Sequence, residues 1–290
     1  MTMPPLETNA GRAPARHTGR ALLAAALLLA LAACQREAPA PAGPGSAPPL
    51  AGDTAALPGA LQAELKDTVE TTERYVIGIS YAPVINRHPG LAKLIRAYDA
   101  GLRAELLEAV EAYGNDRPGV PYELSMSYDA VLDTPALVAI AADGSRYTGG
   151  AHGEPLVERF VWLATEERLL GAAELVPERA GWLAIGDYVQ EQLHTASSVR
   201  ADADRLEPEA RARVVRDAGG MIEEGTGPDP DNFSRFEPVV DAAGRITAVR
   251  FVFPPYQVAP YALGTQTVDV PAAVILPHVA DRHRSLFATP

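Results

Sequence analysis

Tyr-Glu-Leu-Ser-Met-Ser-Tyr-Asp, from Tyr122 to Asp129, alternates apolar and polar side chains without a break. Because successive side chains of a β-strand point to opposite faces, this alternation predicts a strand with one buried and one solvated face. Strands of this kind are typical of antiparallel sheets that cover a core on one side only. The stretch therefore favours a fold that contains such a sheet.

The segments before this strand predict a second strand and a long helix. Residues 75–81 place Tyr and Ile at every second position, which indicates a strand. Residues 91–113 carry apolar side chains at spacings of three and four, and Gly114 follows them. That pattern predicts a long amphipathic helix that Gly114 ends.

The later elements come in groups and do not alternate strictly between strand and helix. We expect strands over 137–141, 156–164, 236–240, 246–253 and 268–270, and helices over 182–193 and 207–217. Asp143-Gly144 predicts a turn. We therefore predict an α+β fold of two small subdomains with mostly antiparallel sheets and one long amphipathic helix in the N-terminal half. The hinge between the halves is expected near Gly149 to Pro155.

The first 34 residues predict an export signal with a lipid attachment site. Three arginines precede an unbroken Ala/Leu run from Ala21 to Leu31, too short for a membrane span of roughly 20 residues. The run ends in Leu31-Ala-Ala-Cys34, which resembles the bacterial lipobox and contains the sole cysteine of the chain. The alternatives are a plain secretory signal, or a free cysteine buried in a short core helix.

The predicted layout has four parts. They are a lipoprotein signal peptide at 1–33, a Pro/Ala-rich disordered tether at 34–60, an N-terminal subdomain at 61–153 and a C-terminal subdomain at 154–285. Several acyl chains, palmitate among them, would anchor the mature chain stably through Cys34. Gln35 follows the cysteine, which favours the periplasmic side of the outer membrane in a Gram-negative cell.

Composition and charge limit the partners. The chain has 290 residues, 47% hydrophobic and 21% charged, as in a globular protein with a sizeable core. Its net charge of −12 argues against nucleic acid or an anionic lipid surface as a partner. The sequence contains no P-loop, no dinucleotide fingerprint and no Gly-x-Ser-x-Gly, and its histidines lie far apart. We therefore expect neither cofactor nor metal.

Four motifs together resemble a known family. They are Tyr81-Ala-Pro-Val-Ile-Asn86, Gly149-Gly-Ala-His152, the segment from Phe160 to Leu170, and a Tyr-x-x-Ala-Pro-Tyr-x-x-Gly segment with Tyr256, Tyr261 and Gly264. They are similar to the RsiV/PdaC-like extracytoplasmic domain family, of the DUF3298/DUF4163 type, over most of residues 75–279.

This resemblance implies a module of the cell envelope. In one branch of the family the region binds lysozyme outside the cell, and in another it precedes a separate deacetylase domain. We expect no anti-sigma segment before the signal and no deacetylase domain after Pro290, so we do not expect sigma-factor control or deacetylation to carry over. We therefore expect a non-catalytic lipoprotein that binds lysozyme or peptidoglycan-related ligands, or one with only a structural role in the outer membrane.

Five residues are candidates for the binding site: Gly149, Gly150, His152, Tyr256 and Tyr261. The glycines allow close backbone approach, and rigid tyrosines beside prolines suit recognition. The alternative for His152 is a turn in which its ring caps backbone groups, and the alternative for both tyrosines is packing in the core. As a rival function, His152 with Glu154 or Asp129 would act as a proton-transfer catalyst on a wall polymer.

Overall fold

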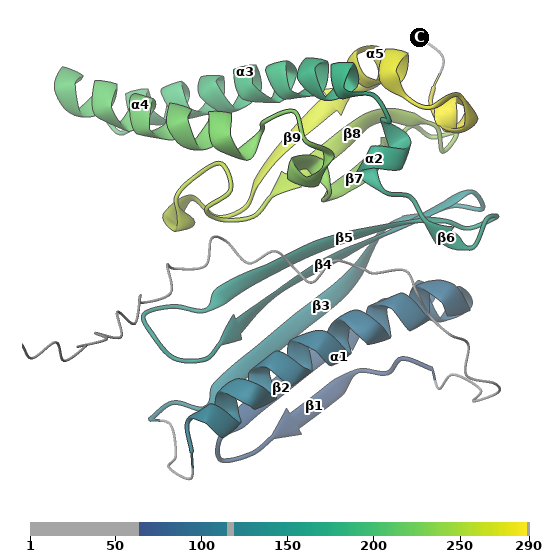
Figure 1. The fold of residues 1–290 in the computed structure, drawn as a ribbon, viewed down its shortest axis with the longest axis vertical. Helices are drawn as coiled ribbons and strands as arrows, with labels where there is room; N and C mark the ends of the chain where they lie inside the picture. The colour runs from purple at the N-terminus through teal and green to yellow at the C-terminus, as the bar shows by residue number, and fades with distance from the viewer. Residues whose placement is uncertain (1–63, 115–118, 289–290) are drawn as a thin grey trace, which may run out of the picture. The chain divides into compact units, whose positions relative to one another are not determined.

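The computed structural model describes residues 64–114 and 119–288, which form two sheets and several helices (Figure 1). The predicted signal peptide, Cys34 and the predicted tether lie outside these residues. The first sheet has the strand order β1-β2-β3-β4-β5-β6, and the second has the order β7-β8-β9. All pairs except β2–β3 are antiparallel. The predicted α+β class with mostly antiparallel sheets is confirmed.

The strands of the first sheet are β1 (Thr68–Thr71), β2 (Tyr75–Tyr81), β3 (Tyr122–Asp133), β4 (Leu137–Tyr147), β5 (Glu154–Leu163) and β6 (Arg168–Leu169). Those of the second are β7 (Phe236–Val240), β8 (Ile246–Phe253) and β9 (Gln266–Pro271). The helices are α1 (Pro89–Ala112), α2 (Ala172–Leu175), α3 (Arg179–Ala203), α4 (Pro208–Gly225) and α5 (Ala272–Ile275). Short 3-10 turns are η1 (Pro83–Arg87), η2 (Pro230–Phe233), η3 (Tyr261–Leu263), η4 (Leu276–His278) and η5 (Asp281–Leu286).

Helix α1 is the predicted amphipathic helix, and it connects the parallel strands β2 and β3 across one face of the first sheet (Figure 1). Its buried side chains include Leu91, Ile95 and Leu106, in one core with the inward side chains of β3. Gly114 follows the helix with a positive φ of 81°. The Arg74 guanidinium donates to the carbonyl of Val110 in the last turn and to that of Gly114, so a cation satisfies the end of the helix.

The first half of β4 and the last residues of β5 are buried on both faces, which explains the apolar runs at 137–142 and 160–163. Val138 and Ile140 face the core under α1, whereas Leu137 and Ala139 pack against residues of the second sheet and of α3. In β5 Phe160 and Trp162 likewise face α1, and their neighbours face the other way. This part of the first sheet is therefore the middle layer between α1 and the C-terminal elements.

Two expectations about the middle of the chain are wrong. Asp143-Gly144 is not a turn but an interior part of β4, where Gly144 pairs with Met126 and Leu156. A Cβ on Gly144 would lie 2.0 Å from the Ser125 carbonyl oxygen, so close strand packing explains this glycine. The segment near Gly149 to Pro155, expected as a hinge, is the turn joining β4 to β5 within one sheet.

Helices α3 and α4 are longer than their apolar patterns predicted. The second half of α3 and most of α4 have few buried side chains, so periodicity gave little signal there. Pro208 lies in the first turn of α4, where proline is well tolerated. Both helices lie over the second sheet in Figure 1.

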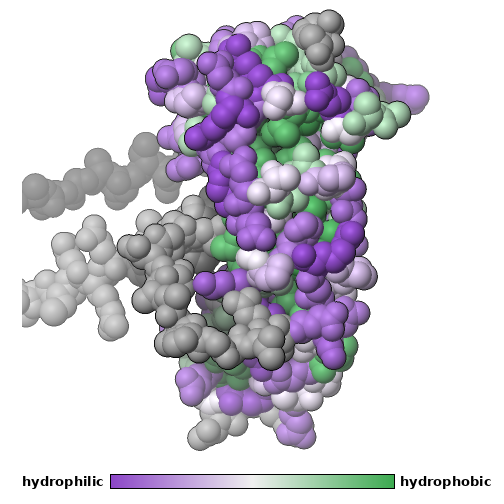
Figure 2. Space-filling model, turned by 90° about the vertical axis from the view of Figure 1, so that its right-hand side faces the viewer, coloured by the Kyte–Doolittle hydropathy of each residue, from purple (hydrophilic) through white to green (hydrophobic). Residues whose placement is uncertain are grey.

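The surface of the described residues is mixed in character. Figure 2 shows one side on which hydrophilic residues predominate and hydrophobic ones appear between them. Within residues 64–114 and 119–288, no helix is long and apolar enough to cross a membrane.

Candidate functional site

His152 meets Tyr256 and Tyr261 in space, although about a hundred residues separate it from the two tyrosines in the chain. The imidazole of His152 stacks on the ring of Tyr261, with centroids 4.1 Å apart and planes 20° from parallel. Tyr256 completes the group: its ring centroid is 5.7 Å from that of Tyr261, and its hydroxyl is 3.4 Å from His152 Nε2. These three side chains form what we call the aromatic cluster.

The β4–β5 turn holds the first part of the cluster. Gly149 and Gly150 have φ values of 101° and 94°, a left-handed conformation that glycine adopts at little cost. The Gly153 carbonyl lies 3.1 Å from His152 Nδ1 and also accepts a hydrogen bond from the Tyr261 hydroxyl at 3.4 Å. The turn is thereby connected to the loop after β8.

The loop after β8 holds the two tyrosines. Tyr256 has a φ of 74°, which is uncommon for a residue with a side chain. The next residue, Gln257, donates through its amide to the carbonyls of Gly225 and Asn232 at 3.0 and 2.8 Å. These bonds fix the loop to the end of α4 and to η2, so hydrogen bonds hold the segment that carries Tyr256 in place.

Exposure decides between the alternatives for these aromatic residues. Tyr256 is 44% exposed, His152 is exposed and Tyr261 is half-buried, so the cluster faces solvent. Core packing is therefore wrong for Tyr256. Phe253, the last residue of β8 before this loop, is 0% exposed and belongs to the core.

The two carboxylates expected as partners of His152 are engaged elsewhere. Glu154 is paired with Arg146 at 2.5 Å, and Arg146 is also paired with Glu105 of α1. In the register of β3 and β4, Asp129 lies opposite Ala141, whereas Glu123 lies opposite Tyr147, next to the turn. At about 3.3 Å per residue, this register places Asp129 roughly 20 Å along the sheet from the turn. The geometry gives no support to proton transfer between His152 and either group.

A buried polar group that the sequence did not single out lies under α1. Asp99 is 7% exposed and accepts hydrogen bonds from Tyr81 and Tyr128 at 2.6 and 2.5 Å. Burial raises the pKa of Asp99 above its usual range, although both hydrogen bonds act in the opposite direction. Its position was a usable signal, because residue 99 is four after Ile95 on the apolar face of the helix.

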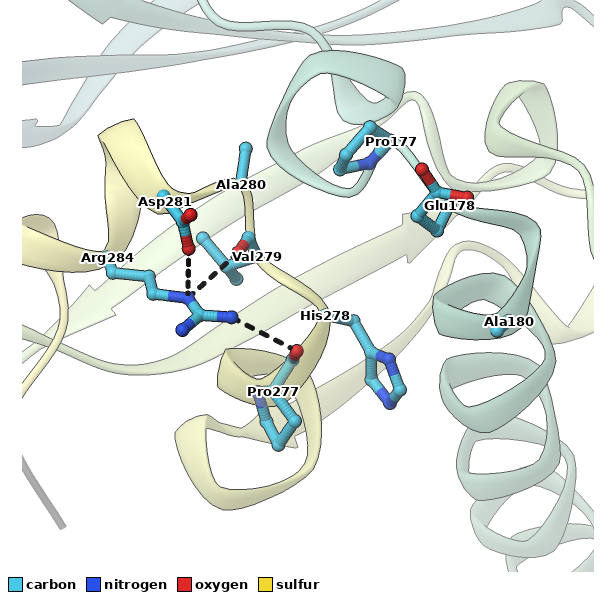
Figure 3. A pocket seen from close by; sticks show the side chains of 9 residues that line it. All are labelled: Pro177, Glu178, Ala180, Pro277, His278, Val279, Ala280, Asp281 and Arg284. Atoms are coloured by element: carbon cyan, nitrogen blue, oxygen red, sulfur yellow. Dashed lines mark hydrogen bonds and ion pairs between the residues drawn. The ribbon is translucent and has the colours of Figure 1, made fainter.

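A separate cavity of about 480 Å³ lies at the start of α3 (Figure 3). Its lining includes Glu178, His278, Asp281 and Arg284, none of which belongs to the aromatic cluster. Arg284 in this cavity is held by Asp281 at 3.3 Å and by the carbonyl of Val279 at 3.1 Å. Across the described residues, no group of three or more His, Cys, Asp or Glu side chains could hold a metal ion.

Comparison with known proteins finds a family-model match in each half of the described region. Residues 59–154 match the family model "Deacetylase PdaC", and residues 184–273 match "Protein of unknown function (DUF3298)". Two family models thus match successive parts of the chain. His152 lies in the matched PdaC segment, and Tyr256 and Tyr261 lie in the DUF3298 segment. The aromatic cluster is therefore built from both.

One curated relative is the peptidoglycan-N-acetylmuramic acid deacetylase PdaC of Bacillus subtilis (strain 168). It is 27% identical over 154 residues, which are 53% of this chain and 28% of that protein. The chain thus matches little more than a quarter of that relative.

Two crystal structures of DUF3298-family proteins are also similar. The protein from Bacteroides fragilis has a TM-score of 0.48 at 15% identity and covers 75% of this chain and 92% of its own. The protein from Pseudomonas aeruginosa PAO1 has a TM-score of 0.46 at 16% identity, covering 78% and 94%.

Proposed function

We propose that this protein is a non-catalytic binding lipoprotein of the cell envelope, and that the aromatic cluster recognises peptidoglycan-related ligands or lysozyme. One observation carries the proposal: three residues from two domains converge on a solvent-exposed cluster of rings. Tyrosines with few rotatable bonds lose little conformational entropy on binding and are frequent in recognition sites. The peptidoglycan connection comes from the relative in Bacillus subtilis, which is named a peptidoglycan-N-acetylmuramic acid deacetylase.

The binding role is favoured over the enzyme because His152 contacts two tyrosines and a backbone carbonyl. A general acid or base needs a positioned partner and a reacting group within hydrogen-bond reach. Neither Glu154 nor Asp129 supplies that partner in this arrangement.

Cys34 is proposed as the anchor that holds the protein at the outer membrane, facing the periplasm. The support is the Ala/Leu run and the Leu-Ala-Ala-Cys motif at residues 31–34. Growth with radiolabelled palmitate should label the wild-type chain and leave Cys34→Ala unlabelled. Label on the variant would exclude this attachment site.

Binding is tested by retention of the purified full chain on wall sacculi and on immobilised hen lysozyme. We expect retention on at least one of the two, with affinity reduced roughly tenfold or more in Tyr256→Ala and Tyr261→Ala. Val199→Ala is the matched control, because Val199 is 63% exposed on α3 and is not part of the cluster. A wild-type chain that neither matrix retains would reject the proposal. So would soluble products released from sacculi by the wild type but not by His152→Ala.

A further inference from the structure

The aromatic cluster is continued by a second group of tyrosines on the other side of the β4–β5 turn. The ring of Tyr122 packs edge-on against Tyr113, with centroids 6.0 Å apart. A Cβ added to Gly149 would lie 3.9 Å from the Tyr122 hydroxyl, so Tyr122 lies beside the turn. The Tyr147 hydroxyl donates to the carbonyl of Gly150 at 3.3 Å. Aromatic side chains therefore flank this turn on both sides.

Exposure singles out the two ends of this arrangement. Nine large hydrophobic residues are exposed in the part of the chain that the structure describes, and only Tyr113 and Tyr256 among them are aromatic. Tyr113 is 46% exposed at the end of α1, and Tyr256 is 44% exposed in the loop after β8. Figure 1 places the end of α1, the β4–β5 turn and this loop along one side of the drawing. The exposed rings thus lie at one end of the sheet.

The turn between the two ends carries two glycines beside the exposed ring of His152. Residues 149–152 are all exposed, and the two glycines leave their backbone amides open to close approach. Arg146, near the end of β4, is neutralised by Glu105 and Glu154. The groups available to a ligand at the turn are therefore ring faces, phenolic hydroxyls and peptide groups.

We propose that Tyr113 and Tyr256 are the two ends of an extended subsite that binds a linear amino-sugar polymer over several consecutive rings. This inference rests on the proposed function and narrows its ligand to a glycan strand. A pyranose has an apolar C–H face that fits an aromatic ring, and a rim of hydroxyl and acetamido groups that fits hydroxyls and peptide groups. Because Tyr113 and Tyr256 lie on opposite sides of the turn, we expect a ligand that contacts both to span more than one sugar.

Calorimetric titration of the full chain with a disaccharide and a hexasaccharide of β-1,4-linked N-acetylglucosamine tests this length dependence. The hexasaccharide should bind more tightly than the disaccharide. Tyr113→Ala should weaken hexasaccharide binding by roughly threefold to tenfold and leave disaccharide binding within about twofold. Tyr113→Phe keeps the ring and should bind like the wild type, which separates loss of contact from misfolding. Leu183→Ala, an exposed apolar residue on α3, is the control.

The outcomes separate this inference from the proposed function. If Tyr256→Ala weakens binding to sacculi while Tyr113→Ala leaves the hexasaccharide affinity unchanged, the binding role stands and the extended subsite is wrong. Equal weakening of both oligosaccharides by Tyr113→Ala would also overturn it. If neither oligosaccharide binds while lysozyme is retained, the cluster recognises a protein, and the glycan assignment is wrong.

Discussion

Asp99 is a polar residue at a position that helix periodicity assigns to the core. Its neighbours on that face of α1, Ile95 and Leu102, are buried, and Asp99 is buried with them. Two phenolic hydroxyls, one from β2 and one from β3, satisfy the carboxyl group. A buried polar group without such partners would cost about 1–3 kcal/mol. Asp99 thus links the helix to both parallel strands through polar contacts.

The raised pKa of Asp99, caused first by burial, gives a prediction about stability and pH. The folded protein keeps the proton at pH values where the unfolded chain has lost it. Proton binding by Asp99 therefore stabilises the folded state. This stabilisation is complete below the ordinary aspartate pKa of about 3.9, and it is lost as the pH rises through the raised pKa of Asp99. Asp99→Asn should remove the part of this fall in the free energy of unfolding that comes from residue 99, as measured by urea unfolding across this pH range. Asp187→Asn, exposed on α3, should keep the wild-type slope; the same slope in Asp99→Asn would contradict the prediction.

Strand β4 shows, at the scale of the element, why an Asp-Gly pair does not have to make a turn. Gly144 has no Cβ and lets the chain pass close to Ser125 and Met126 of β3. We expect Gly144→Ala to lower the free energy of unfolding by about 1–3 kcal/mol, because backbone atoms of β3 must move. Gly78→Ala in β2 is the control, since a Cβ there meets nothing within 4 Å. Denaturant titration that finds the two variants equally stable would contradict this explanation of Gly144.

The elements that the sequence predicted well are those with one clear periodicity. The strand at Tyr122 and the helix from Pro89 both alternate buried and exposed side chains with their own period, and both were found. Helix α4 buries only Ile222 and Gly225, so its apolar side chains show little periodicity from which its full length could be predicted. For the site, Gly149, Gly150, His152, Tyr256 and Tyr261 were singled out in advance. Their convergence depends on contacts between residues about a hundred apart, which periodicity does not encode.

At the scale of the whole described region, the two sheets share one core. Leu137 and Val161 of the first sheet pack in the same cluster as Trp182 of α3 and Phe251 of β8. A polar link accompanies this core, because Arg159 of β5 is paired with Glu237 of β7. Arg235, just before β7, also donates to the Val157 carbonyl at 2.6 Å. Both links join residues 78 apart in sequence, so no local sequence pattern predicts them.

The Arg159–Glu237 pair gives the last prediction. Their side chains are 7% and 9% exposed, so removal of one leaves a buried charge with fewer partners. Arg159→Met or Glu237→Gln alone should lower the free energy of unfolding by about 3–5 kcal/mol. The double variant should lose clearly less than the two losses combined, because neither charge is then left behind. Arg250 and Asp269, a pair on the second sheet with side chains 41% and 43% exposed, should couple by less than about 1 kcal/mol in the same cycle. Additive losses for Arg159 and Glu237 would mean that this ion pair does not stabilise the junction, and that the shared apolar core alone joins the two sheets.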